Sequence, residues 1–108
     1  MQIDPHIQFV KNLENDKSFE QKLFEPLRMS GIYWGITALD LMNSNCLNEP
    51  HILDIIHKCG NADGGYGASP GHDSHLLYTL SAIQVLVFYD KLDVLDIDLT
   101  CDCTFILF

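Results

Sequence analysis

The segment 75–90 constrains the fold most strongly, because it predicts a helix that is apolar on every side. Between residues 76 and 88, every side chain is apolar except Thr79, Ser81 and Gln84. Such a helix needs cover all round, and it is shorter than the roughly 20 residues that cross a bilayer. An isolated fold of 108 residues offers few places for it. The inner layer of a larger two-layer helical protein offers many, so we expect an all-α fold.

A second helical segment, 29–42, echoes the first at an offset of 44 residues. The offset aligns Ile36 with Leu80 and Leu41 with Val85. A period of about 40–47 residues, with two helices in each unit, is typical of helical-pair repeats, which usually need at least about three copies. Fewer copies fit in this chain. We therefore expect 29–42 and 75–90 to lie side by side as inner helices of an incomplete repeat structure.

The segment between them predicts an outer helix at 49–59. Asn48 is its expected N-cap, Pro50 is tolerated in the first turn, and Gly60 ends it. Its apolar stripe consists of Ile52, Ile55, Ile56 and Cys59. We expect this stripe to pack on the outside of the two inner helices.

The remaining segments carry weaker patterns. Residues 5–15 predict a short helix, and 18–25 predict another that Ser18 caps and that ends before Pro26. The chain then divides into three parts: a helical lead-in (1–28), the first helical-pair repeats (29–98) and a divergent tail (99–108).

Composition excludes some partners and indicates a compartment. Fifteen acidic residues against six basic ones give a net charge of −9, which repels nucleic-acid phosphates and anionic membrane surfaces. The first residues, "MQIDPHIQ", lack the basic and apolar regions of a signal peptide. We therefore expect a cytoplasmic protein without a membrane span, whose four cysteines are reduced thiols.

The stretch "NADGGYGASPGHDSH" (61–75) allows three interpretations. As a nucleotide loop it fails, because Pro70 stands where the third glycine of the fingerprint would be. As a metal site it offers His72 and His75, but a His-x-x-His pair without further partners is weak evidence. A sharp corner between two helices fits better, with Asp73 or Ser74 as the cap of the next helix. Four glycines are expected to supply positive φ angles there: Gly64, Gly65, Gly67 and Gly71.

Two stretches resemble a known family. "LRMSGIYWGITALDLM" (27–42) and "GHDSHLLYTLSAIQVL" (71–86), with the "DGGYG" turn before the second, look like the beta subunit of Rab geranylgeranyltransferase, the type II protein geranylgeranyltransferase. The match covers about residues 25–98. The resemblance implies an α/α toroid of helical pairs around an apolar funnel. It also implies transfer of geranylgeranyl from geranylgeranyl diphosphate to C-terminal cysteines of Rab GTPases, with an alpha subunit, an escort protein and a zinc ion.

The resemblance also assigns four lipid-binding positions. Ser30 stands where farnesyl-transferring relatives have a bulky tryptophan, so a small residue deepens the pocket for a longer isoprenoid. Tyr33 and Trp34 follow one turn later, and Leu80 occupies another wall position. The expected open, cavity-side positions are Tyr33, Ile36, Leu80 and Val87.

Other parts of the family's pattern are missing. The zinc ligands and the basic cluster that holds the diphosphate belong to later repeats, so we assign no catalytic or metal-binding residue and expect the 108-residue chain alone to be inactive. Cys101 and Cys103 resemble a prenyl-acceptor Cys-x-Cys, but five residues follow them. We interpret the chain as a truncated beta subunit.

Two alternatives stay open. The first is a catalytically inert helical fragment that acts at most as an alpha-subunit or lipid-binding module. The second is another α/α toroid, such as a terpene cyclase or a type I prenyltransferase subunit. Ser30 and the stretch "SGIYWG" favour type II.

Overall fold

The computed structural model describes residues 3–15, 25–44 and 46–108, and within these ranges it contains helices and no strand. The predicted helix at 18–25 lies outside the described residues, apart from Glu25. The elements are α1 (Ile3–Asn15), η1 (Glu25–Leu27), α3 (Arg28–Leu41), α4 (Glu49–Cys59), α5 (Leu76–Phe88), η2 (Leu92–Val94) and α6 (Ile97–Leu107). The all-α prediction is confirmed, and the three strongest helices lie within two residues of their predicted bounds.

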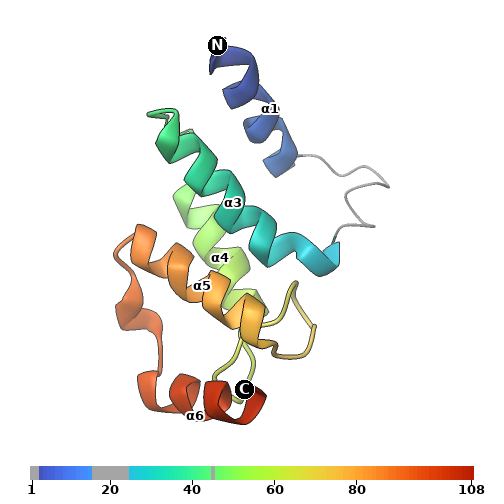
Figure 1. Cartoon of the computed structure of the whole chain (residues 1–108), viewed down its shortest axis with the longest axis vertical. Coiled ribbons are helices and arrows are strands. Elements are labelled where there is room, and N and C mark those ends of the chain that lie inside the picture. The colour runs from blue at the N-terminus through green and yellow to red at the C-terminus, as the bar shows by residue number, and fades with distance from the viewer. Residues whose placement is uncertain (1–2, 16–24, 45) are drawn as a thin grey trace.

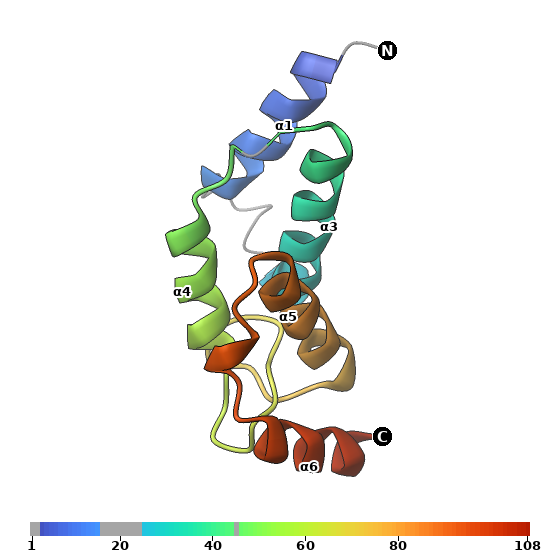
Figure 2. The ribbon, with the colours of Figure 1, turned by 90° about the vertical axis from the view of Figure 1, so that its left-hand side faces the viewer.

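Helices α3 and α5 lie side by side and run in roughly the same direction, while α4 covers them from one side (Figures 1 and 2). The three helices share one core of buried side chains. It consists of Met29 and Ile36 from α3, Ile52, Ile55, Ile56 and Cys59 from α4, and Ala82, Val85 and Leu86 from α5. The predicted arrangement of two inner helices and one outer helix is confirmed.

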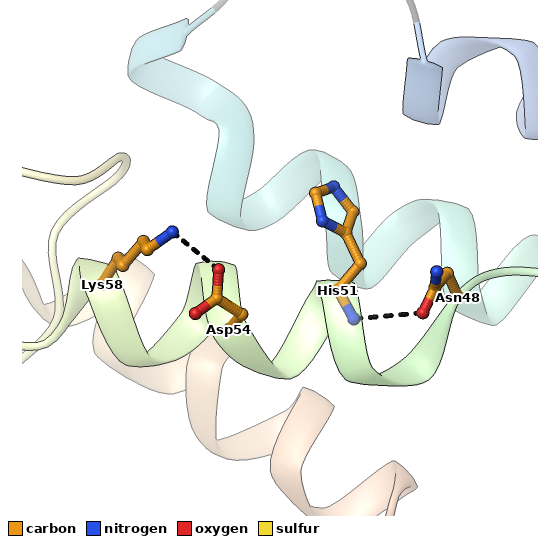
Figure 3. Close-up of polar contacts among 4 residues, drawn as sticks. All are labelled: Asn48, His51, Asp54 and Lys58. Carbon is orange, nitrogen blue, oxygen red and sulfur yellow. Dashed lines mark hydrogen bonds and ion pairs between the residues drawn. The ribbon is translucent and has the colours of Figure 1, made fainter.

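Helix α4 has one apolar side and one polar side. The Asn48 side chain accepts a hydrogen bond from the His51 backbone N–H at 3.2 Å, as expected of an N-cap. Further along, the Lys58 ammonium lies 2.7 Å from the Asp54 carboxylate, on the side away from the core (Figure 3). Gly60 ends the helix in extended backbone, with φ −70°, and not in a left-handed turn.

Helix α1 packs against α3 where α3 carries a glycine (Figure 1). A Cβ atom at Gly35 would lie 3.5 Å from Val10 Cγ1, which is an ordinary van der Waals distance, so this contact brings α1 beside Gly35 without requiring a glycine there. Within the part of the chain that the structure describes, nothing lies within 4 Å of a Cβ position at Gly31, four residues earlier. The space beside Gly31 is open.

The loop 61–75 turns as predicted, but its glycines act in two ways. Gly64 (φ 84°) and Gly71 (φ 82°) have positive φ angles, whereas Gly65 and Gly67 do not, so that expectation was wrong for two of the four. A Cβ atom at Gly65 would lie 2.6 Å from Cys103 Sγ, and one at Gly67 would collide with the His72 carbonyl oxygen. These two glycines are required for close packing.

The same loop holds the first turns of both inner helices. The Met29 backbone N–H donates to the Ala68 carbonyl at 2.9 Å, and the buried Ser69 hydroxyl donates to the Glu25 carbonyl at 2.6 Å. On the other side, the Tyr66 N–H donates to Thr79 Oγ1 of α5 at 3.0 Å. The loop therefore fixes where α3 and α5 begin, which confirms its architectural role.

His75 caps α5, so the predicted Asp73 or Ser74 cap was wrong. The His75 backbone is extended and its Nδ1 accepts the Leu77 N–H at 3.1 Å. The Ser74 hydroxyl is engaged elsewhere, because it donates to Asp63 Oδ1 at 2.7 Å and accepts from Asn61 Nδ2 at 2.9 Å. The loop's internal hydrogen bonds thus leave the cap to the next residue.

Helix α6 packs on this loop. Asp96 caps it through the Leu99 N–H, and its buried Thr100 hydroxyl donates to the Gly64 carbonyl at 2.8 Å. The boundary that we placed at residue 98 falls inside α6, and the divergence of the tail stays a prediction. Across the described ranges, no helix combines the length and the apolar character that a membrane crossing requires.

Candidate functional site

The faces of α3 and α5 do not match at the offset of the sequence echo. An offset of 44 pairs Ile36 with Leu80 and Leu41 with Val85, but the structure buries Ile36 and Val85 and exposes Leu80 and Leu41. An offset of 46 pairs like with like, for example the exposed Trp34 with the exposed Leu80. Both helices are apolar on several sides. The offset of 44 therefore pairs residues of similar type that lie on different sides of their helices.

A stripe of exposed apolar residues runs along α3 and α5, opposite the core. The open face, as we call it, consists of Gly31, Trp34 and Leu41 on α3 and Leu77, Leu80 and Val87 on α5. Successive members on each helix are three and seven residues apart, so they share one side of it. Trp34 is 60% exposed and Leu80 is 51% exposed. An exposed apolar stripe of this length indicates a binding surface.

The expected open positions are only partly correct. Leu80 and Val87 are exposed, as predicted, whereas Ile36 is 3% exposed and belongs to the core. Tyr33 is half-buried and packs against that core. Ile36 and Tyr33 lie on the side of α3 that faces α4, which the sequence did not distinguish from the opposite side.

The four predicted lipid-binding residues therefore occupy three different environments. Trp34 and Leu80 lie on the open face, and Tyr33 lies on the core side of α3. Ser30 is 2% exposed and lies between the two helices, with its Oγ 3.4 Å from Ser81 Oγ. The structure brings three of the four near one surface, while their lipid-binding role stays a prediction.

Ser81 is the residue that sequence reasoning missed at this site. We treated it as an interruption of an apolar helix, yet it is 4% exposed and faces Ser30. A signal was present, because the distance between two packed helices depends on the size of the side chains at their contact, and serine is small.

A small hollow lies elsewhere, toward the C-terminal ends of α3 and α5. It is lined by Ile36, Leu39, Ser44, Cys46, Leu47, Phe88 and Tyr89. None of the predicted lipid-binding residues lines it, so it does not explain their placement.

The polar groups of the described ranges do not form a metal site. In those ranges, no three His, Cys, Asp or Glu side chains lie together as a metal ion requires. Burial raises the pKa of the Cys59 thiol to about 11, so it stays protonated at neutral pH and is a poor ligand or nucleophile. Hydrogen bonds from Ser74 and the Gly65 N–H lower the pKa of Asp63, whose carboxylate serves the loop. The described residues therefore do not fit a zinc ion.

Comparisons with known proteins agree with this helical architecture. The domain profile of the prenyltransferase alpha-alpha toroid matches residues 1–105, and the chain belongs to that family. It is 46% identical to the geranylgeranyl transferase type-2 subunit beta of Candida albicans over 88 residues, which are 80% of this chain and 26% of the relative.

Two further relatives carry the same kind of name. The chain is 42% identical to geranylgeranyl transferase type-2 subunit beta 1 of Arabidopsis thaliana over 85 residues, 77% of this chain and 26% of the relative. It is 42% identical to the probable type-2 subunit beta of Caenorhabditis elegans over 90 residues, 82% of this chain and 27% of the relative. The predicted resemblance is confirmed. The chain spans about a quarter of the length of these relatives.

Proposed function

We propose that this chain forms the first helical pairs of a type-2 geranylgeranyl transferase beta subunit and that its open face binds part of the geranylgeranyl chain. The observation that carries the proposal is the open face itself, where Trp34, Leu77 and Leu80 are exposed on two adjacent helices. The names of the relatives support the choice of isoprenoid. They do not favour the alternative of an inert module.

The chemistry of the open face suits an isoprenoid. A geranylgeranyl chain is long and uncharged, and its transfer from water onto apolar side chains gains free energy with the area covered. Gly31 adds room, because no described residue outside its own helix turn comes within 4 Å of a Cβ position there. A lipid laid along the face would cover side chains that otherwise contact water.

The remaining parts of the reaction are proposed from the family resemblance. The acceptor would be a Rab GTPase delivered by an escort protein, the donor geranylgeranyl diphosphate, and the partner an alpha subunit, in the cytoplasm. Zinc would activate the acceptor thiol in the whole enzyme. Since the described residues do not fit a metal, we assign this chain to lipid binding and not to thiol activation.

Trp34 is the chain's only tryptophan, so its fluorescence reports directly on the open face. We expect geranylgeraniol to shift the Trp34 emission to shorter wavelength in a saturable way, because the lipid replaces water around the ring. Geranylgeraniol is the better probe because its neutral head group avoids repulsion by the net charge of −9.

A matched pair of substitutions locates the site. Leu80→Glu places a charge on the open face and should abolish the shift, whereas Leu92→Glu places one at another exposed leucine, in η2, and should leave it intact. The proposal fails if the wild-type chain gives no saturable shift, or if both variants lose it equally.

A further inference from the structure

Ser30 and Ser81 meet in the buried seam between α3 and α5. Their Oγ atoms are 3.4 Å apart, and the two side chains are 2% and 4% exposed. The Ser81 hydroxyl donates to the Leu77 carbonyl at 3.1 Å, so in the contact between the serines the Ser30 hydroxyl is the donor. A distance of 3.4 Å makes this a weak hydrogen bond. The small volume of the two side chains matters more at this point than the bond between them.

The seam lies directly beneath the open face. Ser30 is four residues before Trp34, and Ser81 is four residues after Leu77, so each serine neighbours an exposed residue on its own helix. The two serines therefore form the floor between Trp34 and Leu77. Any enlargement of either serine must push the helices apart or emerge between these exposed side chains.

We infer that Ser81 is a second specificity-determining residue, which acts with Ser30 to set the length of isoprenoid that the open face accepts. The inference rests on the proposed function. It makes the tolerance for a bulky residue at position 30 depend on position 81. Because Ser81 Oγ lies 3.4 Å from Ser30 Oγ, a larger side chain at position 30 has no room toward α5. The space beside Gly31 leaves it room toward the open face.

The test compares farnesol with geranylgeraniol, using the Trp34 emission of the full 108-residue chain to measure both dissociation constants. The wild-type chain should prefer geranylgeraniol. Ser81→Leu should shift the ratio of the two constants toward farnesol by at least about fivefold, since part of the lipid loses its apolar contact. Ser81→Ala keeps the small volume and should keep the preference.

Rescue and control variants separate this role from a general loss of packing. Ser30→Gly added to Ser81→Leu should restore at least half of the lost preference, because it returns volume to the seam. Ala82→Leu enlarges the next residue, which is buried in the core. It should lower the melting temperature without changing the ratio. If circular dichroism shows that Ser81→Leu does not fold, Ser81→Val takes its place.

Each outcome decides something. A wild-type chain that binds neither alcohol overturns the proposed function and this inference with it. A wild-type chain that binds both alcohols equally overturns the inference alone. A wild-type preference that Ser81→Leu leaves unchanged overturns the inference alone. So does a shift in the ratio that Ala82→Leu reproduces or that Ser30→Gly fails to reverse.

Discussion

The outward side of α4 and the open face of α3 and α5 both point away from the core, yet their chemistry is opposite. The α4 side carries Asn48, His51, Asp54 and Lys58, which make polar contacts along the helix (Figure 3). The open face carries apolar side chains and a bare glycine. Water satisfies the first and not the second. The outward side of α4 can therefore stay in contact with water, whereas the open face has the character of a surface that an apolar group covers.

The largest expected effect comes from the core that both regions share. Ile56 of α4 is 1% exposed, so Ile56→Ala should reduce the free energy of unfolding by about 3 kcal/mol. Leu80→Ala, on the open face, should change it by less than about 0.5 kcal/mol and still weaken geranylgeraniol binding. Chemical denaturation of both variants measures the free energy of unfolding, and Trp34 emission measures the binding of geranylgeraniol. Equal losses of stability would mean that the open face is part of the core.

The second test concerns the reactivity of the Cys59 thiol, at the end of α4. Cys59 is 1% exposed and its pKa is raised from 9.0 to about 11 by burial, which corresponds to about a hundredfold less thiolate at equal pH. A raised folded pKa means that stability is full below pH 9 and is lost as the pH rises toward 11. A disulfide reagent at pH 8 should therefore modify the exposed Cys101 quickly and Cys59 only as fast as the chain unfolds.

Mass spectrometry of the labelled peptides identifies which thiol has reacted. Cys101→Ser removes the fast labelling of residue 101 and serves as the control, and rapid labelling of Cys59 in that variant would contradict the burial of Cys59 in the core.

The third test is the cap of α4. Asn48→Ala removes the acceptor for the His51 N–H and should cost about 1 kcal/mol, because a first-turn donor loses its partner. Asn48→Asp retains an acceptor and should keep most of the stability. Thermal unfolding measures both. A loss as large with Asp as with Ala would show that the cap hydrogen bond is not what Asn48 contributes.

The sequence predicted where the helices lie better than how they face one another. Asn48, Pro50 and Gly60 bound α4, since caps and breakers act locally. The faces of α3 and α5 depend on how two apolar helices are aligned, and a pattern that is apolar all round carries little information on that alignment. The echo at 44 residues therefore placed Ile36 on the open side, although the structure buries it.

The candidate site shows the same limit. Trp34 and Leu80 were found through the family resemblance, whereas Ser81 required the structure, because its significance comes from Ser30 on another helix 51 residues away. The His75 cap was missed for a related reason. Asp73 was expected to cap α5 and lies outside it, and Ser74 is held by Asn61 and Asp63 across the loop.

The smallest expected effect concerns the ion pair on the outward side of α4. The hydrogen bond from Lys58 lowers the pKa of the Asp54 carboxyl group, and the positive charge of Lys58 lowers it further. Because the pKa of Asp54 is lower in the folded chain, the ion pair contributes to the free energy of unfolding above the unfolded-state pKa. This contribution is lost as the pH falls through the folded-state pKa. Both side chains are more than half exposed, so water and salt screen the pair.

Lys58→Ala should therefore leave the melting temperature at pH 7 almost unchanged, and it should flatten the pH dependence of stability below about pH 4. Thermal melts from pH 2 to pH 7 at low and high salt measure this. A large loss with Lys58→Ala at pH 7 would mean that the outward side of α4 is not simply a solvated surface, and the contrast with the open face would be correspondingly weaker.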